Sequence, residues 1–135
     1  MKVREVMSTN VACCTGQDSM ETAADKMESL NVGAIPVVNK GQVIGMVTDR
    51  DLAIRGVAHN GAENISQVMS QNVVTISPDA SVEEAAALMA QHQIRRLPVV
   101  EDGQLVGMLS IGDLSVNELS NETAGVALTD ISKNF

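Results

Sequence analysis

The chain has 135 residues, a formal net charge of −8 and a pI of about 4.5, and 44% of its residues are apolar. This acidity excludes both the basic footprint that binds nucleic acid and the polybasic surface that binds anionic membranes. No apolar run reaches the roughly 18 residues of a membrane helix, and the first residues lack the apolar stretch of a signal peptide. We therefore expect a cytoplasmic protein whose partners include no nucleic acid and no membrane.

An internal duplication dominates the sequence. A shift of 62 residues places the chain on itself without a gap, and 19 of the 47 positions from 6 to 52 are identical to their partners. We predict repeat 1 over residues 1–60, repeat 2 over 61–120, and a C-terminal tail over 121–135 that is a short helix or disordered.

Each repeat is expected to have the order β-α-β-β-α. Ser19 and Ser81 are N-cap residues ahead of apolar residues at helical spacing, and Gly41 and Gly103 permit positive φ in tight hairpins. In repeat 1 the expected elements are a helical turn near Val6, a strand over 11–14, a helix from Ser19, strands over 35–38 and 43–48, a helix over about 49–56, and a polar linker over 58–63. The same elements recur 62 residues later, with a last helix over about 111–119.

The size of one repeat predicts how the two combine. About 50 residues are too few to bury a sheet well, so we expect an α+β fold in which the two repeats pack sheet to sheet with pseudo-two-fold symmetry. Such packing creates two equivalent interface clefts, and junctions of this kind are frequent ligand sites.

The residues that carry the duplication resemble the CBS domain family. The resemblance rests on Gly45-Met46-Val47-Thr48-Asp49-Arg50-Asp51 and Gly107-Met108-Leu109-Ser110-Ile111-Gly112-Asp113, preceded by Ile35-Pro36-Val37-Val38 and Leu97-Pro98-Val99-Val100. It covers about residues 1–120, and within the family the chain looks like the small stand-alone bacterial proteins that consist of one CBS pair without a catalytic domain. It implies a regulatory module that binds AMP, ADP, ATP or S-adenosylmethionine, and a homodimer formed through the helices that begin near Asp49 and Ile111.

The resemblance also implies roles for single residues. Asp51 and Asp113 would bind the ribose hydroxyls, and Thr48 and Ser110 the sugar-phosphate region. The chemistry is suitable, because a carboxylate accepts two hydrogen bonds from a vicinal diol and the N–H groups of a helix N-terminus favour an anion. The alternative is that Thr48 and Asp49 only cap the second helix.

Two adjacent arginines distinguish the repeats. Arg95 and Arg96 occupy the positions of Gly33 and Ala34, and arginine is the usual partner of phosphate. The alternative is a surface salt bridge to one of the many acidic residues. Arg50 is a second candidate for ligand binding, with pairing to Asp49 or a glutamate as its alternative.

These observations predict two clefts of unequal charge, at least one of them suited to a phosphorylated adenosine ligand. We expect no required cofactor, no metal site and no enzymatic activity, since nothing marks a catalytic acid–base pair. The competing hypothesis is a structural or interaction module that acts through a homodimer and a partner protein without a small ligand. The predicted ligand-binding residues are Ile35, Pro36, Thr48, Asp49, Arg50, Asp51, Arg95, Arg96, Leu97, Pro98, Ser110 and Asp113.

Overall fold

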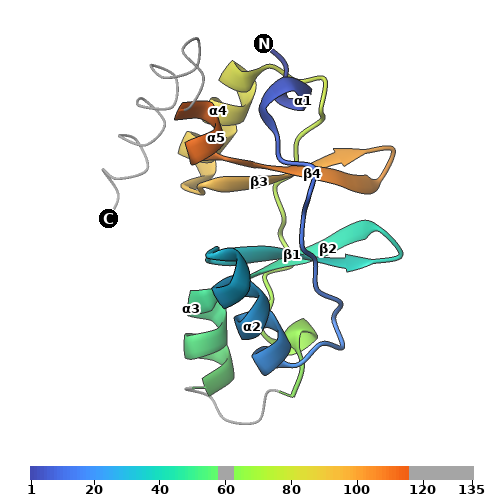
Figure 1. The fold of residues 1–135 in the computed structure, drawn as a ribbon, viewed down its shortest axis with the longest axis vertical. Coiled ribbons are helices and arrows are strands. Elements are labelled where there is room, and N and C mark those ends of the chain that lie inside the picture. Colours follow the sequence, from blue (N-terminus) through green and yellow to red (C-terminus); the bar gives the residue numbers. More distant parts are fainter. Residues whose placement is uncertain (58–62, 116–135) are drawn as a thin grey trace. The chain divides into compact units, whose positions relative to one another are not determined.

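The computed structural model describes residues 1–57 and 63–115, which form two compact units (Figure 1). Of these residues, unit 1 combines 1–11 with 74–115, and unit 2 combines 12–57 with 63–73. The fold is α+β, as predicted, and each unit contains one two-stranded antiparallel sheet. Most of the predicted linker, the end of the last predicted helix and the predicted tail lie outside the described residues.

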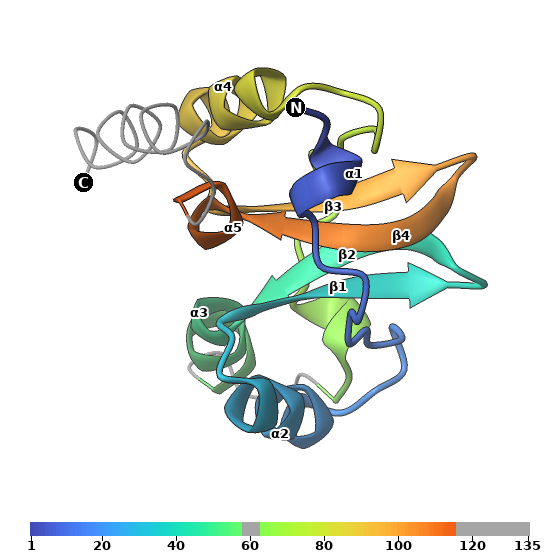
Figure 2. The same cartoon turned by 45° about the horizontal axis from the view of Figure 1, so that its top comes forward.

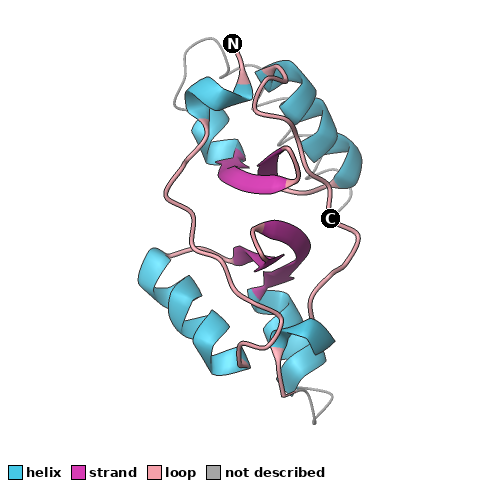
Figure 3. Cartoon of the chain, turned by 90° about the vertical axis from the view of Figure 1, so that its right-hand side faces the viewer, coloured by secondary structure: helices cyan, strands magenta, loops and turns pink. Residues whose placement is uncertain are grey.

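The elements alternate between helices and hairpins in both units. Unit 2 contains α2 (Met20–Leu30), β1 (Ala34–Asn39), β2 (Gln42–Thr48), α3 (Asp49–Asp51), the π-helical segment η1 (Leu52–Val57) and the 3₁₀ turn η2 (Ile65–Gln67). Unit 1 contains α1 (Val3–Val6), α4 (Val82–His92), β3 (Arg96–Glu101), β4 (Gln104–Ser110) and α5 (Ile111–Ser115). In each unit the helices lie on one face of the hairpin (Figure 3).

The two long helices begin and end in the same way. Ser19 and Ser81 are N-caps, as predicted, and their hydroxyls accept the backbone N–H groups of Thr22 and Glu84, each at 3.1 Å. Both helices end in a left-handed residue with φ of 55°, which is Asn31 in α2 and Gln93 in α4. The conformation closes the last turn and directs the chain into the following strand.

Both hairpins have two-residue turns in which Gly41 and Gly103 have positive φ, as predicted. Lys40 and Gly41 join β1 to β2 with φ of 54° and 83°, and Asp102 and Gly103 join β3 to β4 with φ of 52° and 79°. Two successive positive φ values give the turn a twist that matches the strands.

The extended run before each long helix contributes less than a full strand. Cys14 makes a single parallel bridge to Val37, and Ile76 makes one to Val99. Each bridge uses both backbone groups of its residue. The N–H of Cys14 donates to Pro36, and its carbonyl accepts from Val38, at 3.0 and 2.8 Å. The predicted first strand is therefore reduced to one residue in each repeat.

The compact units do not coincide with the sequence repeats, because each repeat gives its first segment to the other unit. Ser8 pairs with Met108 of β4, and Val3 donates its N–H to Ala80 at 2.8 Å. In unit 2, Ser70 pairs with Met46 of β2. The predicted boundary at residue 60 therefore describes the duplication in the sequence, and the structure divides the chain at different positions.

Each unit has its own aliphatic core. The core of unit 1 is built on α4, whose Val82, Ala85 and Met89 are at most 1% exposed. Burial of one such Met or Val side chain stabilises the fold by about 1.5–3 kcal/mol. The core of unit 2 contains Cys14, Ala23, Met27, Ile35, Val37, Val47, Leu52, Ile65 and Val68. Among the described residues, no helix is long and apolar enough to cross a membrane.

Candidate functional site

The candidate site of unit 1 lies where β3 begins and β4 ends, with α5 starting beside them (Figure 2). Arg96 is the register partner of Ser110 across the hairpin. The carbonyl of Arg95 accepts the N–H of Ile111 at 2.9 Å. The antiparallel register therefore places both arginines next to the motif that contains Ser110 and Asp113.

Ser110 and Asp113 cap the start of α5 reciprocally. The Asp113 N–H donates to the Ser110 hydroxyl at 3.1 Å, and the Ser110 N–H donates to Oδ2 of Asp113 at 2.8 Å. From the sequence, capping was considered for Thr48 and Asp49; in this motif the cap is formed by Ser110 and Asp113. It uses one carboxylate oxygen only, and within the described part of the chain Oδ1 of Asp113 makes no hydrogen bond or ion pair.

The two arginines of this site carry positive charge at the surface. Arg95 is exposed and Arg96 is half-buried. Neither guanidinium forms a salt bridge with any carboxylate in residues 1–57 or 63–115. Among these residues, the salt bridge considered as the alternative role of this pair is therefore not formed.

Unit 2 has the same geometry with different charges. Thr48 is the register partner of Ala34, and the N–H of Asp49 donates to the carbonyl of Gly33 at 2.9 Å. Thr48 and Asp51 form the second reciprocal cap. The Asp51 N–H donates to the Thr48 hydroxyl at 3.0 Å, and the Thr48 N–H donates to Oδ2 of Asp51 at 2.9 Å. This end of the hairpin has no counterpart of the arginine pair.

Acidic and basic side chains alternate along the helix start of unit 2. Oδ1 of Asp49 accepts the backbone N–H of Arg50 at 2.8 Å, and the guanidinium of Arg50 makes no ion pair with a described residue. Arg55 was not predicted as part of this site. Its Nε lies 3.9 Å from Oδ1 of Asp51, and its Nη1 donates to the carbonyl of Val68 at 3.4 Å. The four-residue spacing of Asp51 and Arg55 on a helix could have indicated this contact.

The apolar residues predicted to bind ligand are buried. Ile35 and Leu97 are 1% and 0% exposed and belong to the cores of units 2 and 1. Pro36 and Pro98 are also buried, and their carbonyls accept the N–H groups of Cys14 and Ile76 at 3.0 and 3.1 Å. Their part in ligand binding stays a prediction, and their part in the hairpins is structural.

Three other features of the described residues were considered as functional sites: metal ligands, the two thiols and a cavity. No three His, Cys, Asp or Glu side chains in this part of the chain come together as a metal site. Burial raises the pKa of the Cys13 and Cys14 thiols, which keeps them protonated near neutral pH. A cavity of about 240 Å³ lies in unit 2, and none of the predicted ligand-binding residues lines it.

Comparison with known proteins gives the same architecture. The CBS domain family model matches residues 3–56 and 65–117. The CBS domain-containing protein YhcV of Bacillus subtilis is 50% identical over 132 residues, which cover 96% of this chain and 94% of the relative.

Two solved structures extend the comparison. A hypoxic response protein with two coordinated zinc ions has a TM-score of 0.80 at 27% identity, covering 87% of this chain and 98% of its own. The CBS domain pair of protein MJ0100, in complex with 5-methylthioadenosine and S-adenosyl-L-methionine, has a TM-score of 0.78 at 28% identity, covering 86% and 94%. CBS domains generally act as regulatory modules, and some relatives join one to an enzyme, as in a homoserine O-acetyltransferase. With both repeats matched by the family model and a relative of nearly the same length at 50% identity, this chain belongs to the CBS domain family.

Proposed function

We propose that this protein is a regulatory module that binds an adenosine-containing ligand, and that its unit 1 site prefers a ligand with a phosphate group. The observation that carries the proposal is the position of Arg95 and Arg96 beside the Ser110–Asp113 cap. The adenosyl ligands of the MJ0100 structure support the ligand class.

The carboxylate of Asp113 is suited to a ribose. Its Oδ2 is held by the Ser110 N–H at 2.8 Å, which fixes the orientation of the group. Oδ1 remains available to accept a hydrogen bond from a sugar hydroxyl. A carboxylate fixed in this way loses little side-chain entropy when the ligand binds.

The charges of the two sites favour different ligands. Arg95 and Arg96 outnumber the single carboxylate of Asp113, so the unit 1 site attracts an anion. At the corresponding place in unit 2, Asp49 and Asp51 balance Arg50 and Arg55, and Arg55 lies close to Asp51. We therefore expect AMP, ADP or ATP at the unit 1 site and a weaker preference for phosphate at the unit 2 site.

Calorimetry and thermal denaturation of the full chain test this function. A ligand at 100 times its Kd should stabilise the protein by about 2.7 kcal/mol. The probes are AMP, ADP, ATP, S-adenosylmethionine and adenosine. The absence of binding by all five at millimolar concentration would contradict the proposal.

An arginine pair that binds phosphate can be tested with a matched control. Arg95→Gln with Arg96→Gln should weaken AMP binding by about tenfold, or 1.4 kcal/mol, and leave adenosine binding unchanged. Arg4→Gln removes another arginine of unit 1, one that already pairs with Asp79 and Glu101, and should leave AMP binding unchanged. Equal losses for AMP and adenosine would show that the pair acts on the fold and not on phosphate.

A second candidate function is a homodimeric interaction module that acts without a small ligand. It is supported by Ile54 and Val57 of η1, which are 51% and 74% exposed. Val57→Asp should then shift the protein from dimer to monomer in analytical ultracentrifugation, while Leu30→Asp, at a 51% exposed position of α2, should not. A wild-type chain that is monomeric at high concentration would contradict this function.

A further inference from the structure

The cavity of unit 2 lies beside the turn of the β1–β2 hairpin. Its polar walls come from Thr15, Gln17, Asn39 and Ser66, and its apolar wall includes Ile44, which is 37% exposed. None of the residues assigned above to the adenosine ligand contributes to it. The cavity is therefore separate from the site of the proposed function.

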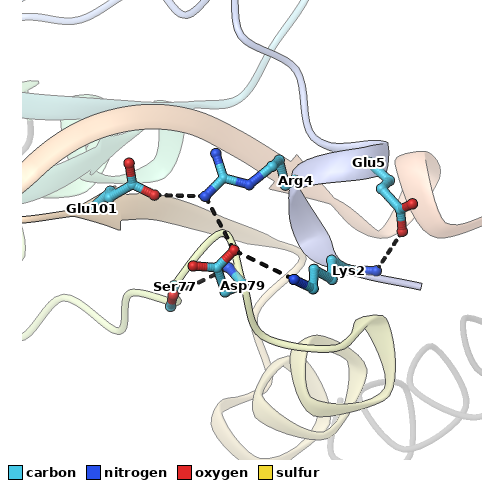
Figure 4. A network of polar contacts seen from close by, with 6 residues as sticks. All are labelled: Lys2, Arg4, Glu5, Ser77, Asp79 and Glu101. Carbon is cyan, nitrogen blue, oxygen red and sulfur yellow. Dashed lines mark hydrogen bonds and ion pairs between the residues drawn. The ribbon is translucent and has the colours of Figure 1, made fainter.

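A long side chain lies at the corresponding place in unit 1. The 62-residue shift pairs Ser66 with Arg4, and Figure 4 shows the Arg4 guanidinium between two carboxylates. Its Nη2 lies 3.1 Å from Oδ1 of Asp79 and 2.7 Å from Oε2 of Glu101. These hydrogen bonds raise the pKa of Arg4 above its ordinary value.

The backbone around the two places makes matching hydrogen bonds. The N–H of Arg4 donates to Pro78 at 2.9 Å, and the N–H of Ser66 donates to Gly16 at 2.9 Å. The next pair of hydrogen bonds also matches, since Val3 donates to Ala80 at 2.8 Å and Ile65 donates to Asp18 at 2.9 Å. Because the frames agree, the cavity results from side chains. Ser66 is shorter than Arg4, and Gly16 lacks the ring of Pro78.

The charges of the aligned wall residues differ between the two units. Gln17 and Asn39 occupy the positions of Asp79 and Glu101, so neutral amides replace the two carboxylates. Lys40 occupies the position of Asp102, and it carries the sole charge among the described residues that line the cavity. The walls therefore offer a cation and amide N–H donors where unit 1 offers acids.

We propose that this cavity binds a small organic anion, namely a carboxylate with a short aliphatic chain. The carboxylate accepts hydrogen bonds from Lys40 and from the amides of Gln17 and Asn39, which are charge-assisted and strong. The aliphatic chain lies against Val38 and Ile44. A volume of about 240 Å³ is below the roughly 300–1,000 Å³ of clefts for drug-sized ligands, so the ligand has only a few carbon atoms.

Titration of the ¹⁵N-labelled full chain by NMR tests the charge of the ligand. The probes are butyrate, butyramide and butylammonium, which share a chain and differ in the polar group. Butyrate should shift the amide signals of residues 15–17, 38–44 and 66, and should bind at least about tenfold more tightly than the other two. No shifts with butyrate, or equal binding of butylammonium, would overturn the proposal.

Variants test the location. Ser66→Arg combined with Gln17→Asp and Asn39→Glu rebuilds the network of unit 1 inside unit 2 and should abolish butyrate binding. Lys40→Gln changes one exposed side chain and should weaken binding about fivefold. Lys2→Gln removes an exposed lysine of unit 1 and should leave binding unchanged. Unchanged binding in the Lys40→Gln variant, or in a rebuilt variant that is folded, would overturn the proposed site.

Discussion

Gly107 stands in the motif that resembles ligand-binding sequences, but its surroundings predict a role in packing. A Cβ atom at this position would lie 2.7 Å from Sδ of Met7 and 2.9 Å from the carbonyl oxygen of Ser8. Ser8 is fixed, because it exchanges two 2.9 Å hydrogen bonds with Met108. Gly107→Ala must therefore displace a paired backbone segment, at a cost of about 1–3 kcal/mol and roughly 4–15 °C in Tm for a domain of this size.

Urea denaturation followed by circular dichroism measures this loss, and Gly112→Ala is its matched control. A Cβ at Gly112 would meet only the hydroxyl oxygen of Ser110, at an ordinary 3.5 Å, and the residue lies within α5. Alanine there should stabilise the protein by about 0.5–1 kcal/mol. Adding Met7→Ala to Gly107→Ala should restore only part of the loss, since the Ser8 carbonyl remains. A Gly107→Ala protein as stable as the wild type would refute the packing argument.

Three other predictions concern a cap, an ion-pair network and a thiol. Ser110→Ala should lower the free energy of unfolding by about 1 kcal/mol in urea denaturation, since α5 loses its cap, and an unchanged midpoint would contradict this. Arg4→Gln should lower Tm at low salt, and should lower it less at about 0.5 M NaCl, because salt screens the exposed ion pairs of Arg4. An equal loss of Tm at both salt concentrations would contradict this. As a control, Arg50→Gln should show no salt-dependent loss of Tm. Burial raises the pKa of Cys14 in the folded protein, so the free energy of unfolding should be retained at neutral pH and fall above about pH 9. Iodoacetamide should alkylate Cys14 faster in urea than in the native state. Equal alkylation rates in the two states would contradict this.

The sequence predicted the local features of the fold well. Ser19 and Ser81 as caps, and Gly41 and Gly103 in the turns, follow from residue type and spacing alone. The pairing of Ser8 with Met108 could not be predicted in this way. It depends on which hairpin edge accepts a segment distant in sequence, and both edges have nearly the same sequence.

The candidate site was predicted in part. The hairpin register places Arg96 opposite Ser110, and a reader of the sequence can derive this once the strands and turn are known. A cap that uses a single carboxylate oxygen of Asp113 was harder to anticipate, because the sequence presents capping and ligand binding as alternatives. The structure shows that capping engages one of its two carboxylate oxygens.

The cavity of unit 2 could not be predicted from the sequence, for a different reason. Its origin is the loss of a long side chain at Ser66 and of a ring at Gly16, which are unremarkable substitutions when each is considered alone. They matter because both act on one place, and only the geometry of the Arg4 network in unit 1 identifies that place.

The exchange of first segments between the repeats determines where this polypeptide can be cut. A fragment of residues 1–60 would keep a hairpin but lose Ser70, which pairs with Met46, and Ile65, which belongs to the same core. A fragment of residues 12–73 is continuous and retains both. The compact unit is therefore offset from the duplicated piece by about a dozen residues.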